Sequence, residues 1–402
     1  MAVRKAQAGF TQLKSLRIIQ VLSAPPLPFG SAAGRWSSAM LKGLTARGHR
    51  VESFAPCRDA AEQAEAARTF PQPEYSLRCF DYANRPQLQS KIAALQRPQS
   101  YIYSREMESA LHRSLRNPYD ILHLEQHWSG WLTLPPPPRT LVSLYSLFRL
   151  DCPEPPAGGL MDRVRYRRIW DAEAGLLSKF PRICTLSPEM SDEVRTIHPQ
   201  AKVDTVPLGM DLDNYSFDTM PDEGNPTVTM IGSLDWLPTR TAAVRLLTQL
   251  WPSIREQVPS VSLHIVGRNA RSILAGYVGV PGVTIEENVP DILPYFRQAT
   301  VLLYAPERGC GMKVKVLESF ALGLPVVTTR SGVEGIPAVD GVHAGICEDD
   351  AGLIERCVSL LKDPSARSRQ RKAARSLVES WCSAGVVLDA LEGIYKEMIA
   401  TN

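Results

Sequence analysis

Short apolar runs alternate with amphipathic helical segments along most of the chain. Apolar runs at residues 17–22 and 49–56 flank a helical pattern at 35–47, whose apolar residues recur on one stripe. This order predicts a parallel sheet with helices on both faces. Further strands are expected at residues 120–124, 140–145, 182–186 and 203–207, and helices at 160–179 and 189–197, whereas 59–116 has a helical pattern throughout.

The alternation stops at residues 208–226, which are turn-rich and acidic, as is typical of an interdomain linker. It then restarts, with strands expected at 227–231, 262–266, 283–285, 300–304 and 325–328, and helices at 239–250, 291–298, 350–378 and 383–399. A chain of 402 residues also exceeds what one hydrophobic core usually serves. We therefore predict an α/β protein with two doubly wound domains that face each other across a cleft, a favoured place for ligands.

Residues 305–327 carry the clearest ligand signal. Gly309 and Gly311 follow a predicted strand and precede a predicted helix, so the backbone there can approach a ligand closely. The free N–H groups at the start of that helix favour a phosphate. Lys315 and Glu318 share one helix face, which can offer a cation to a diphosphate and a carboxylate to a ribose. An ordinary strand–loop–helix unit without a ligand also explains the two glycines.

A second candidate site follows the predicted strand at residues 120–124. Glu125 and His127 come directly after it, and ligands of open α/β sheets bind outside the carboxyl ends of the strands. Both a site role and a structural role stay open for these side chains. The loop at residues 25–34 lacks the Gly-x-Gly-x-x-Gly pattern, which argues against a dinucleotide-dependent oxidoreductase.

Charge is distributed unevenly between the two halves. Residues 1–205 carry 27 Lys and Arg against 19 Asp and Glu, and residues 206–402 carry 18 against 23. A basic half suits an anionic ligand or an acidic membrane surface, and a solvated face explains it too. The same alternatives hold for Arg163, Arg165, Arg167 and Arg168 on one predicted helix. The net charge of +3 is too small to indicate nucleic-acid binding.

The eight cysteines are scattered, without the spacing of a zinc site, and suit a reducing cytosol. The N-terminus lacks a signal-peptide core, and no apolar run is long enough to span a membrane. We therefore expect a cytoplasmic protein, for which peripheral membrane contact through the basic half stays open.

Four motifs stand in order in the second half of the chain: residues 206–211, 232–238, 266–268 and the loop and helix of 305–327. In this order they resemble the retaining GT-B glycosyltransferases of family 4, also called group 1. The resemblance implies two Rossmann-like domains, with an acceptor in residues 1–207 and a nucleotide-diphosphate sugar in 208–378. A C-terminal helix in 379–402 would cross back to the first domain. The implied reaction transfers a sugar to a hydroxyl of a glycan, a lipid-linked acceptor or a small molecule, without a metal or another cofactor.

The resemblance also implies residue roles. Glu318 matches a glutamate that holds the ribose hydroxyls, whereas Cys310 stands where a second glutamate is usual. The expected catalytic residues are Glu125, which would orient or deprotonate the acceptor hydroxyl, and Arg240 and Lys315, which would stabilise the leaving diphosphate. The expected donor-binding residues are Gly34, Gly232, Ser233, Gly267, Asn288, Val289, Gly309, Cys310, Gly311, Met312, Lys313 and Glu318. Gly30 and His127 are expected on the acceptor side.

Two other functions stay open. A non-catalytic partner protein that binds a sugar nucleotide is favoured by Cys310, and by Ser233, which stands where the family has an arginine. A sugar-nucleotide epimerase of similar fold needs no acceptor. Donor consumption with and without an acceptor therefore separates an epimerase from a transferase.

Overall fold

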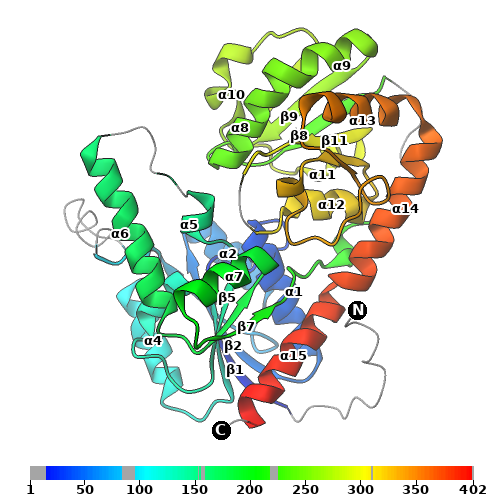
Figure 1. The fold of residues 1–402 in the computed structure, drawn as a ribbon. Coiled ribbons are helices and arrows are strands. Elements are labelled where there is room, and N and C mark those ends of the chain that lie inside the picture. Colours follow the sequence, from blue (N-terminus) through cyan, green and yellow to red (C-terminus); the bar gives the residue numbers. More distant parts are fainter. Residues whose placement is uncertain are drawn as a thin grey trace.

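The computed structural model describes residues 15–83, 96–152, 154, 159–217, 225–308 and 311–400. These residues form two parallel sheets flanked by helices, one sheet in each half of the chain (Figure 1). The predicted α/β fold with two doubly wound units is confirmed by this topology.

The first sheet has seven strands in the order β3-β2-β1-β4-β5-β6-β7. They are β1 (Arg17–Val21), β2 (Arg50–Cys57), β3 (Ser76–Asp81), β4 (Ile121–Glu125), β5 (Thr140–Leu144), β6 (Arg182–Thr185) and β7 (Lys202–Thr205). The helices around them are α1 (Ala32–Ala46), α2 (Ala60–Thr69), α4 (Arg105–Leu115), α5 (Phe148–Asp151), α6 (Leu160–Leu177) and α7 (Pro188–Ile197), with short turns η1 (Ser100–Ile102) and η2 (His127–Leu132). The strand order reverses between β1 and β4, and such a switch point opens a crevice at the carboxyl ends of the strands.

The second sheet has six strands in the order β10-β9-β8-β11-β12-β13. They are β8 (Thr227–Ile231), β9 (Ser262–Gly267), β10 (Val283–Glu287), β11 (Val301–Tyr304), β12 (Val326–Thr328) and β13 (Gly345–Ile346). The accompanying helices are α8 (Leu237–Arg245), α9 (Trp251–Gln257), α10 (Ala270–Ile273), α11 (Leu293–Arg297), α12 (Val314–Leu322), α13 (Asp350–Lys362) and α14 (Pro364–Trp381). Here the order reverses between β8 and β11, so each sheet has its own switch point.

Local sequence explains where several helices begin and end. Ser31 caps α1 by accepting a hydrogen bond from the Gly34 N–H at 3.1 Å, and Ser187 caps α7 with Pro188 as the first helical residue. Gly323 ends α12 in the left-handed conformation at φ 75°, as its place before Pro325 predicts.

One expectation about the fold was wrong. Residues 59–116 are not helical throughout, because β3 forms the edge of the first sheet between α2 and α4. Only Leu77 of β3 is fully buried, and Arg78 lies over the rings of Phe54 and Phe80. An edge strand of this kind has no continuous apolar run, so the hydrophobic pattern does not reveal it.

The last helix, α15 (Ala384–Ala400), follows α14 and packs against α1 of the first sheet (Figure 1). Two of its polar contacts are buried. His49 Nε2 lies 3.1 Å from Glu392, and the Tyr395 hydroxyl is hydrogen-bonded at 2.7 Å to Nδ1 of His123, whose Nε2 bonds Ser143. Burial lowers the pKa of His123 to about 4, so this imidazole is neutral at pH 7. No described helix is long and apolar enough to cross a membrane.

Replacing Tyr395 by Phe should lower the free energy of unfolding by about 1–3 kcal/mol, because Nδ1 of the buried His123 loses its partner. Urea unfolding measures this loss. Tyr119→Phe is the control, since the Tyr119 hydroxyl bonds Pro138 at an exposed position where water can replace it. Equal losses in the two variants would contradict the account of the α15 contact.

Candidate functional site

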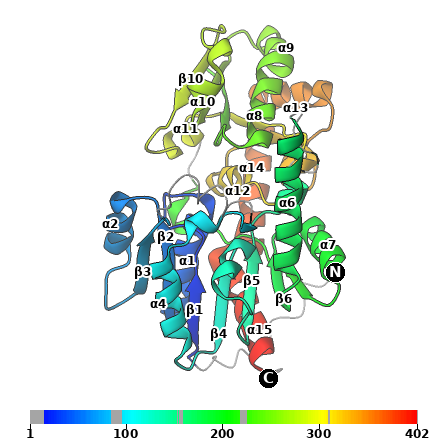
Figure 2. The ribbon, with the colours of Figure 1, turned by 90° about the vertical axis from the view of Figure 1, so that its left-hand side faces the viewer.

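A cleft of about 740 Å³ is lined by residues of both halves of the chain. In Figure 2 the unit that carries β10 lies above the unit that carries β1 to β5. The cleft lies at the carboxyl ends of strands of both sheets, where the two switch points face each other. The first domain contributes Phe29, Gly30, Ser31, Arg35, Tyr145 and Ser146 to its walls, and the second contributes Gly232, Ser233, Trp236, Gly267, Arg268, Asn288, Lys315 and Glu318. A ligand bound here would contact both domains.

Glu318, on α12, makes one of the contacts between the two domains. Its Oε1 lies 2.8 Å from Nη1 of Arg35 on α1 and accepts a hydrogen bond of 3.0 Å from the hydroxyl of Tyr215. Only 2% of the Glu318 side chain is exposed. Burial raises its pKa, and the charge of Arg35, the hydrogen bond from Tyr215 and the charge of Lys315 oppose that rise. The predicted ribose-binding carboxylate therefore lines the cleft with a cation from the other domain beside it.

Lys315, one turn earlier on α12, is a half-buried lysine that lines the cleft. Its Nζ donates to Thr239 Oγ1 at 3.0 Å and lies 3.9 Å from the centre of the Tyr304 ring. A Cβ at Gly232 would come within 2.5 Å of this Nζ, so a glycine at the end of β8 makes room for the amine. Burial lowers the pKa of Lys315 to about 7, with a further lowering by Lys313.

Lys313, in the loop before α12, is bound to groups of the protein itself. Its Nζ donates to the carbonyl of Gly311 at 2.6 Å and lies 3.6 Å from Oε2 of Glu334. Glu334 also accepts from the Gly311 N–H at 3.1 Å and from the hydroxyl of Ser187, in the first domain, at 2.9 Å. Lys313 and Glu334 thus hold the shape of the loop and attach it to the other domain.

Gly311 is where the loop touches the first domain. Its φ is 75°, and a Cβ there would lie 2.6 Å from the carbonyl oxygen of Tyr145, so glycine is required on both grounds. Gly309 and Cys310, two predicted donor-binding residues, lie outside the described residues.

Glu125 does not line the cleft, although it was expected to be catalytic. It is fully buried and accepts hydrogen bonds from the Ser37 hydroxyl, at 2.7 and 2.8 Å to its two oxygens, and from the Ser23 N–H at 3.3 Å. Burial raises its pKa to about 7 against these bonds. Tyr145 does line the cleft, and the charge of Glu125 helps to raise its pKa. Glu125 thus lies beneath the cleft wall, out of contact with an acceptor there.

His127 is also buried, although it was expected on the acceptor side. Its Nε2 lies 3.2 Å from Oε1 of Glu173, and the two side chains are each 1% exposed. Glu173 accepts the N–H groups of Phe148 and Arg149 at the start of α5. The pair holds α5 and α6 to η2, so the structure gives His127 a packing role.

Arg240 and Gly34 also lie away from the cleft lining. Arg240 is exposed on α8, and its Nε donates to the carbonyl of Leu234 at 3.1 Å. A Cβ at Gly34 would lie 2.5 Å from the carbonyl oxygen of Pro25, so this glycine allows α1 to pack beneath the loop. The predicted residues that do line the cleft are Gly30, Gly232, Ser233, Gly267, Asn288, Val289, Met312, Lys313, Lys315 and Glu318.

Several cleft residues escaped prediction from the sequence: Arg35, Tyr145, Tyr215, Trp236, Arg268 and Tyr304. Trp236 and Arg268 stand inside the motifs at residues 232–238 and 266–268, so those motifs could have indicated them. Nothing in the sequence indicates Arg35, because its partner Glu318 is far away in the chain. No three His, Cys, Asp or Glu side chains of the described residues converge as metal ligands would.

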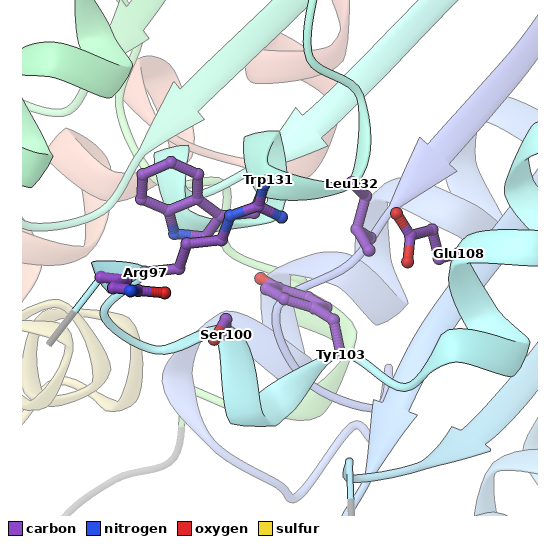
Figure 3. A pocket seen from close by; sticks show the side chains of 7 residues that line it. Arg97, Ser100, Tyr103, Glu108, Trp131 and Leu132 are labelled. Carbon is purple, nitrogen blue, oxygen red and sulfur yellow. The ribbon is translucent and has the colours of Figure 1, made fainter. Parts of the chain in front are cut away.

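A smaller cavity of about 210 Å³ lies within the first domain, between η1, η2 and α4 (Figure 3). The guanidinium of Arg97 lies 5.8 Å from the centre of the Trp131 ring, whose Nε1 donates to Pro98 at 3.0 Å. Tyr103 and Glu108 complete its wall. All of its lining residues belong to one domain, whereas both domains build the cleft.

Models of two protein families match the chain, one in each half. The model described as Glycosyltransferase Family 4 matches residues 33–214, and that described as Glycosyl transferases group 1 matches residues 225–363. Among curated proteins, glycogen synthase of Mycobacterium tuberculosis (strain H37Rv) is 25% identical over 247 residues. That match spans 57% of this chain and 57% of the relative, little more than half of each.

Solved structures with a similar fold cover almost the whole chain. Sucrose-phosphate synthase from Thermosynechococcus elongatus has a TM-score of 0.67 at 16% identity, covering 96% of this chain and all of its own. HepE from Anabaena, solved in complex with UDP and glucose, has a TM-score of 0.67 at 11% identity, covering 95% of this chain and 99% of its own. At these identities the likeness shows a shared fold.

Replacing Glu125 by Gln should change how stability depends on pH. Because burial raises the pKa of Glu125 from 4.5 to about 7, the folded protein keeps a proton that the unfolded chain has lost. The Glu125 carboxyl therefore lowers the free energy of unfolding as the pH rises from about 4.5 to about 7, by on the order of 3 kcal/mol in all. Glu125→Gln removes the loss, so its stability relative to wild type should rise between about pH 4.5 and pH 7.

Urea unfolding across that pH range measures the effect, with the exposed Glu256→Gln as control. Parallel pH profiles of the Glu125→Gln variant and the wild type would show that Glu125 does not keep a proton in the folded protein.

Proposed function

This chain belongs to the family 4 glycosyltransferases, also called group 1, and we propose that it transfers a sugar from a nucleotide-diphosphate sugar to a hydroxyl acceptor. Its two facing parallel sheets have the GT-B fold, as predicted. The observation that carries the proposal is the face of α12 in the cleft, where the half-buried Lys315 and the buried Glu318 stand one turn apart.

The diphosphate of the donor would lie at the amino end of α12. The N–H groups of Val314 and Lys315 open this helix, where the first turn has no acceptors of its own, and its dipole favours an anion. Lys315 adds a cation that no carboxylate of the described residues pairs with directly. UDP bound to HepE, a protein of the same fold, supports a nucleotide donor.

The ribose of the donor would bind at Glu318, whose carboxylate can accept from two hydroxyl groups. Arg35 now lies against this carboxylate, and its Nε is buried without a hydrogen-bond partner among the described residues. Binding would therefore rearrange or share the contact between Arg35 and Glu318. The approach of the two domains would also exclude water, which protects the donor from hydrolysis.

The proposed reaction is an exchange at the anomeric carbon with retention of its configuration. The bond between that carbon and the diphosphate oxygen breaks, and a bond to the acceptor oxygen forms on the same face. Lys315 and the helix N–H groups stabilise the negative charge on the leaving diphosphate. The acceptor proton passes to a phosphate oxygen of the leaving group. We propose no protein nucleophile, metal or other cofactor for this step.

The acceptor and the cellular setting also belong to the proposal. We propose a hydroxyl acceptor on a glycan, a lipid-linked molecule or a small molecule, and a cytoplasmic location, which scattered cysteines support. We further propose peripheral contact of the basic first domain with a membrane.

A second candidate is a partner protein that binds a sugar nucleotide without turnover. Ser233 stands where the family has an arginine, and Arg240 does not line the cleft, so neither position supplies a cation to a donor diphosphate. Release of nucleoside diphosphate from UDP-, GDP- and dTDP-sugars, with and without a panel of acceptors, separates the candidates.

A transferase should release nucleoside diphosphate in an acceptor-dependent manner, and Glu318→Ala should reduce that release by at least about 10-fold through lost ribose contacts. Binding without release would favour the partner protein. Conversion of the donor sugar without any acceptor would favour the epimerase.

Replacing Lys315 by Gln should weaken nucleoside-diphosphate binding by about 10- to 100-fold, because one charge-assisted hydrogen bond is lost. The probe is whichever of UDP, GDP and dTDP stabilises the wild type most in a thermal-shift screen. Binding of the nucleoside without phosphates should not change. Lys362→Gln, at an exposed position of α13, is the control.

The wild-type affinity for that nucleoside diphosphate should also fall as the pH rises above about 7. Above that pH the amine of Lys315 is uncharged in the free protein, and a bound diphosphate requires its protonated form. Titrations at several pH values measure the effect. If Lys315→Gln kept the wild-type affinity and pH profile, Lys315 would not be a diphosphate ligand.

A further inference from the structure

Helix α6 (Leu160–Leu177) has two halves with different surroundings. Its second half packs on the first domain, where Glu173, Leu176 and Leu177 are buried. From Leu160 to Arg168 every side chain is exposed except the half-buried Tyr166. In Figure 1 this amino-terminal end of α6 projects away from the neighbouring ribbons. Tyr166 packs on Phe148 of α5, with ring centroids 5.3 Å apart. Large apolar side chains of the same helix end nevertheless stay exposed, and that needs an explanation.

Three apolar residues share one face of this exposed end. Met161 is 80% exposed, Leu160 is 78% exposed, and these are the highest values among the large hydrophobic side chains of the described residues. Val164 is 42% exposed. Val164 is four positions after Leu160 and three after Met161, and residues at these spacings are neighbours on a helix surface, so the three side chains form one apolar strip. Exposure of such a strip to water is unfavourable, so a binding partner would explain it.

Arginines surround the apolar strip. At 100° per residue, Arg167 and Arg168 lie one turn beyond Val164 on the same side of the helix, and Arg163 and Arg165 lie at its two margins. None of the four forms a salt bridge with another described residue. Asp162, the one acid in this part of the helix, lies on the opposite side. The strip and its margins therefore present apolar groups and positive charge together.

We propose that the apolar strip and the four arginines of α6 form a docking surface for an anionic lipid bilayer. Leu160, Met161 and Val164 would enter the boundary between headgroups and acyl chains. The arginine side chains are long enough to keep their guanidinium groups among the lipid phosphates while their stems stay in apolar surroundings. A soluble polyanion would match the arginines and leave the apolar strip uncovered, so the bilayer explains both sets of residues.

Docking through α6 would orient the catalytic cleft toward the membrane. Helix α6 leads into β6, and a crossover helix runs antiparallel to the strands of its sheet, so its amino end lies at the carboxyl edge of the first sheet. The cleft opens at that same edge. This inference rests on the proposed membrane contact of the first domain and is independent of the proposed sugar transfer.

Cosedimentation of the full chain with vesicles tests the docking surface. Vesicles of phosphatidylcholine with phosphatidylglycerol should bind the protein, vesicles of phosphatidylcholine alone should bind far less, and added salt should release it. The triple variant Arg163→Glu, Arg165→Glu, Arg168→Glu should weaken binding by about 100-fold or more. Leu160→Ser, Met161→Ser, Val164→Ser should weaken it by at least about 10-fold.

The matched control reverses three exposed arginines in the same domain, two on α4 and one directly after it, by Arg105→Glu, Arg113→Glu and Arg116→Glu. Its net charge equals that of the α6 arginine variant, and its binding should stay within a few-fold of wild type. Equal losses in the two would overturn the proposal, and so would absence of binding to anionic vesicles at low salt.

Full binding by the serine variant would also overturn the proposal, since it would indicate a surface for a polyanion. All variants should keep the wild-type melting temperature and, without vesicles, the wild-type affinity for nucleoside diphosphate. That second readout separates failure of the docking surface from failure of the proposed function.

Discussion

The contact between Arg35 and Glu318 is the constraint on which the arrangement of the cleft depends. It joins α1 of the first domain to α12 of the second, and Tyr215 adds a bond from the segment that connects them. A buried carboxylate is costly unless it is paired, so loss of either partner would leave Glu318 with a large desolvation penalty. The position of α12 relative to α1 therefore depends on this carboxylate.

Lys313 and Lys315, the two lysines near this carboxylate, have different roles. Lys313 and Glu334 hold the loop before α12, and the bond from Ser187 to Glu334 fastens that loop to the first domain. Lys315 is left to face the cleft, where a hydroxyl and an aromatic ring surround it. Neither contact neutralises its charge. An anion that enters the cleft would stabilise the charged form of this desolvated amine, which is why Lys315 is central to the proposed donor site.

The sequence predicted the repeated strand–helix order well, because buried parallel strands such as β11 (Val-Leu-Leu-Tyr) and β12 (Val-Val-Thr) appear as apolar runs. It missed β3, whose half-exposed residues give no such run. Within the site, the glycine loop and the face of α12 were predictable, since residues close in sequence determine them.

Contacts between distant residues were not predictable. Arg35 and Tyr215 meet Glu318 only because two domains fold against each other, and no local pattern records that. Glu125 and His127 follow a strand end, as ligand-binding residues often do, yet the loops above them turn both side chains into the protein. A position at a strand end indicates nearness to a cleft, whereas contact with its contents depends on loops that sequence patterns do not describe.

A crystal structure of the protein with its preferred nucleoside diphosphate would test the account most directly. The account predicts phosphate oxygens within hydrogen-bonding distance of Lys315 Nζ and of the N–H groups that open α12, with the ribose hydroxyls on Glu318 and Arg35 displaced or shared. A nucleotide bound in the cavity beside Trp131, or in the cleft with its phosphates away from Lys315, would contradict it.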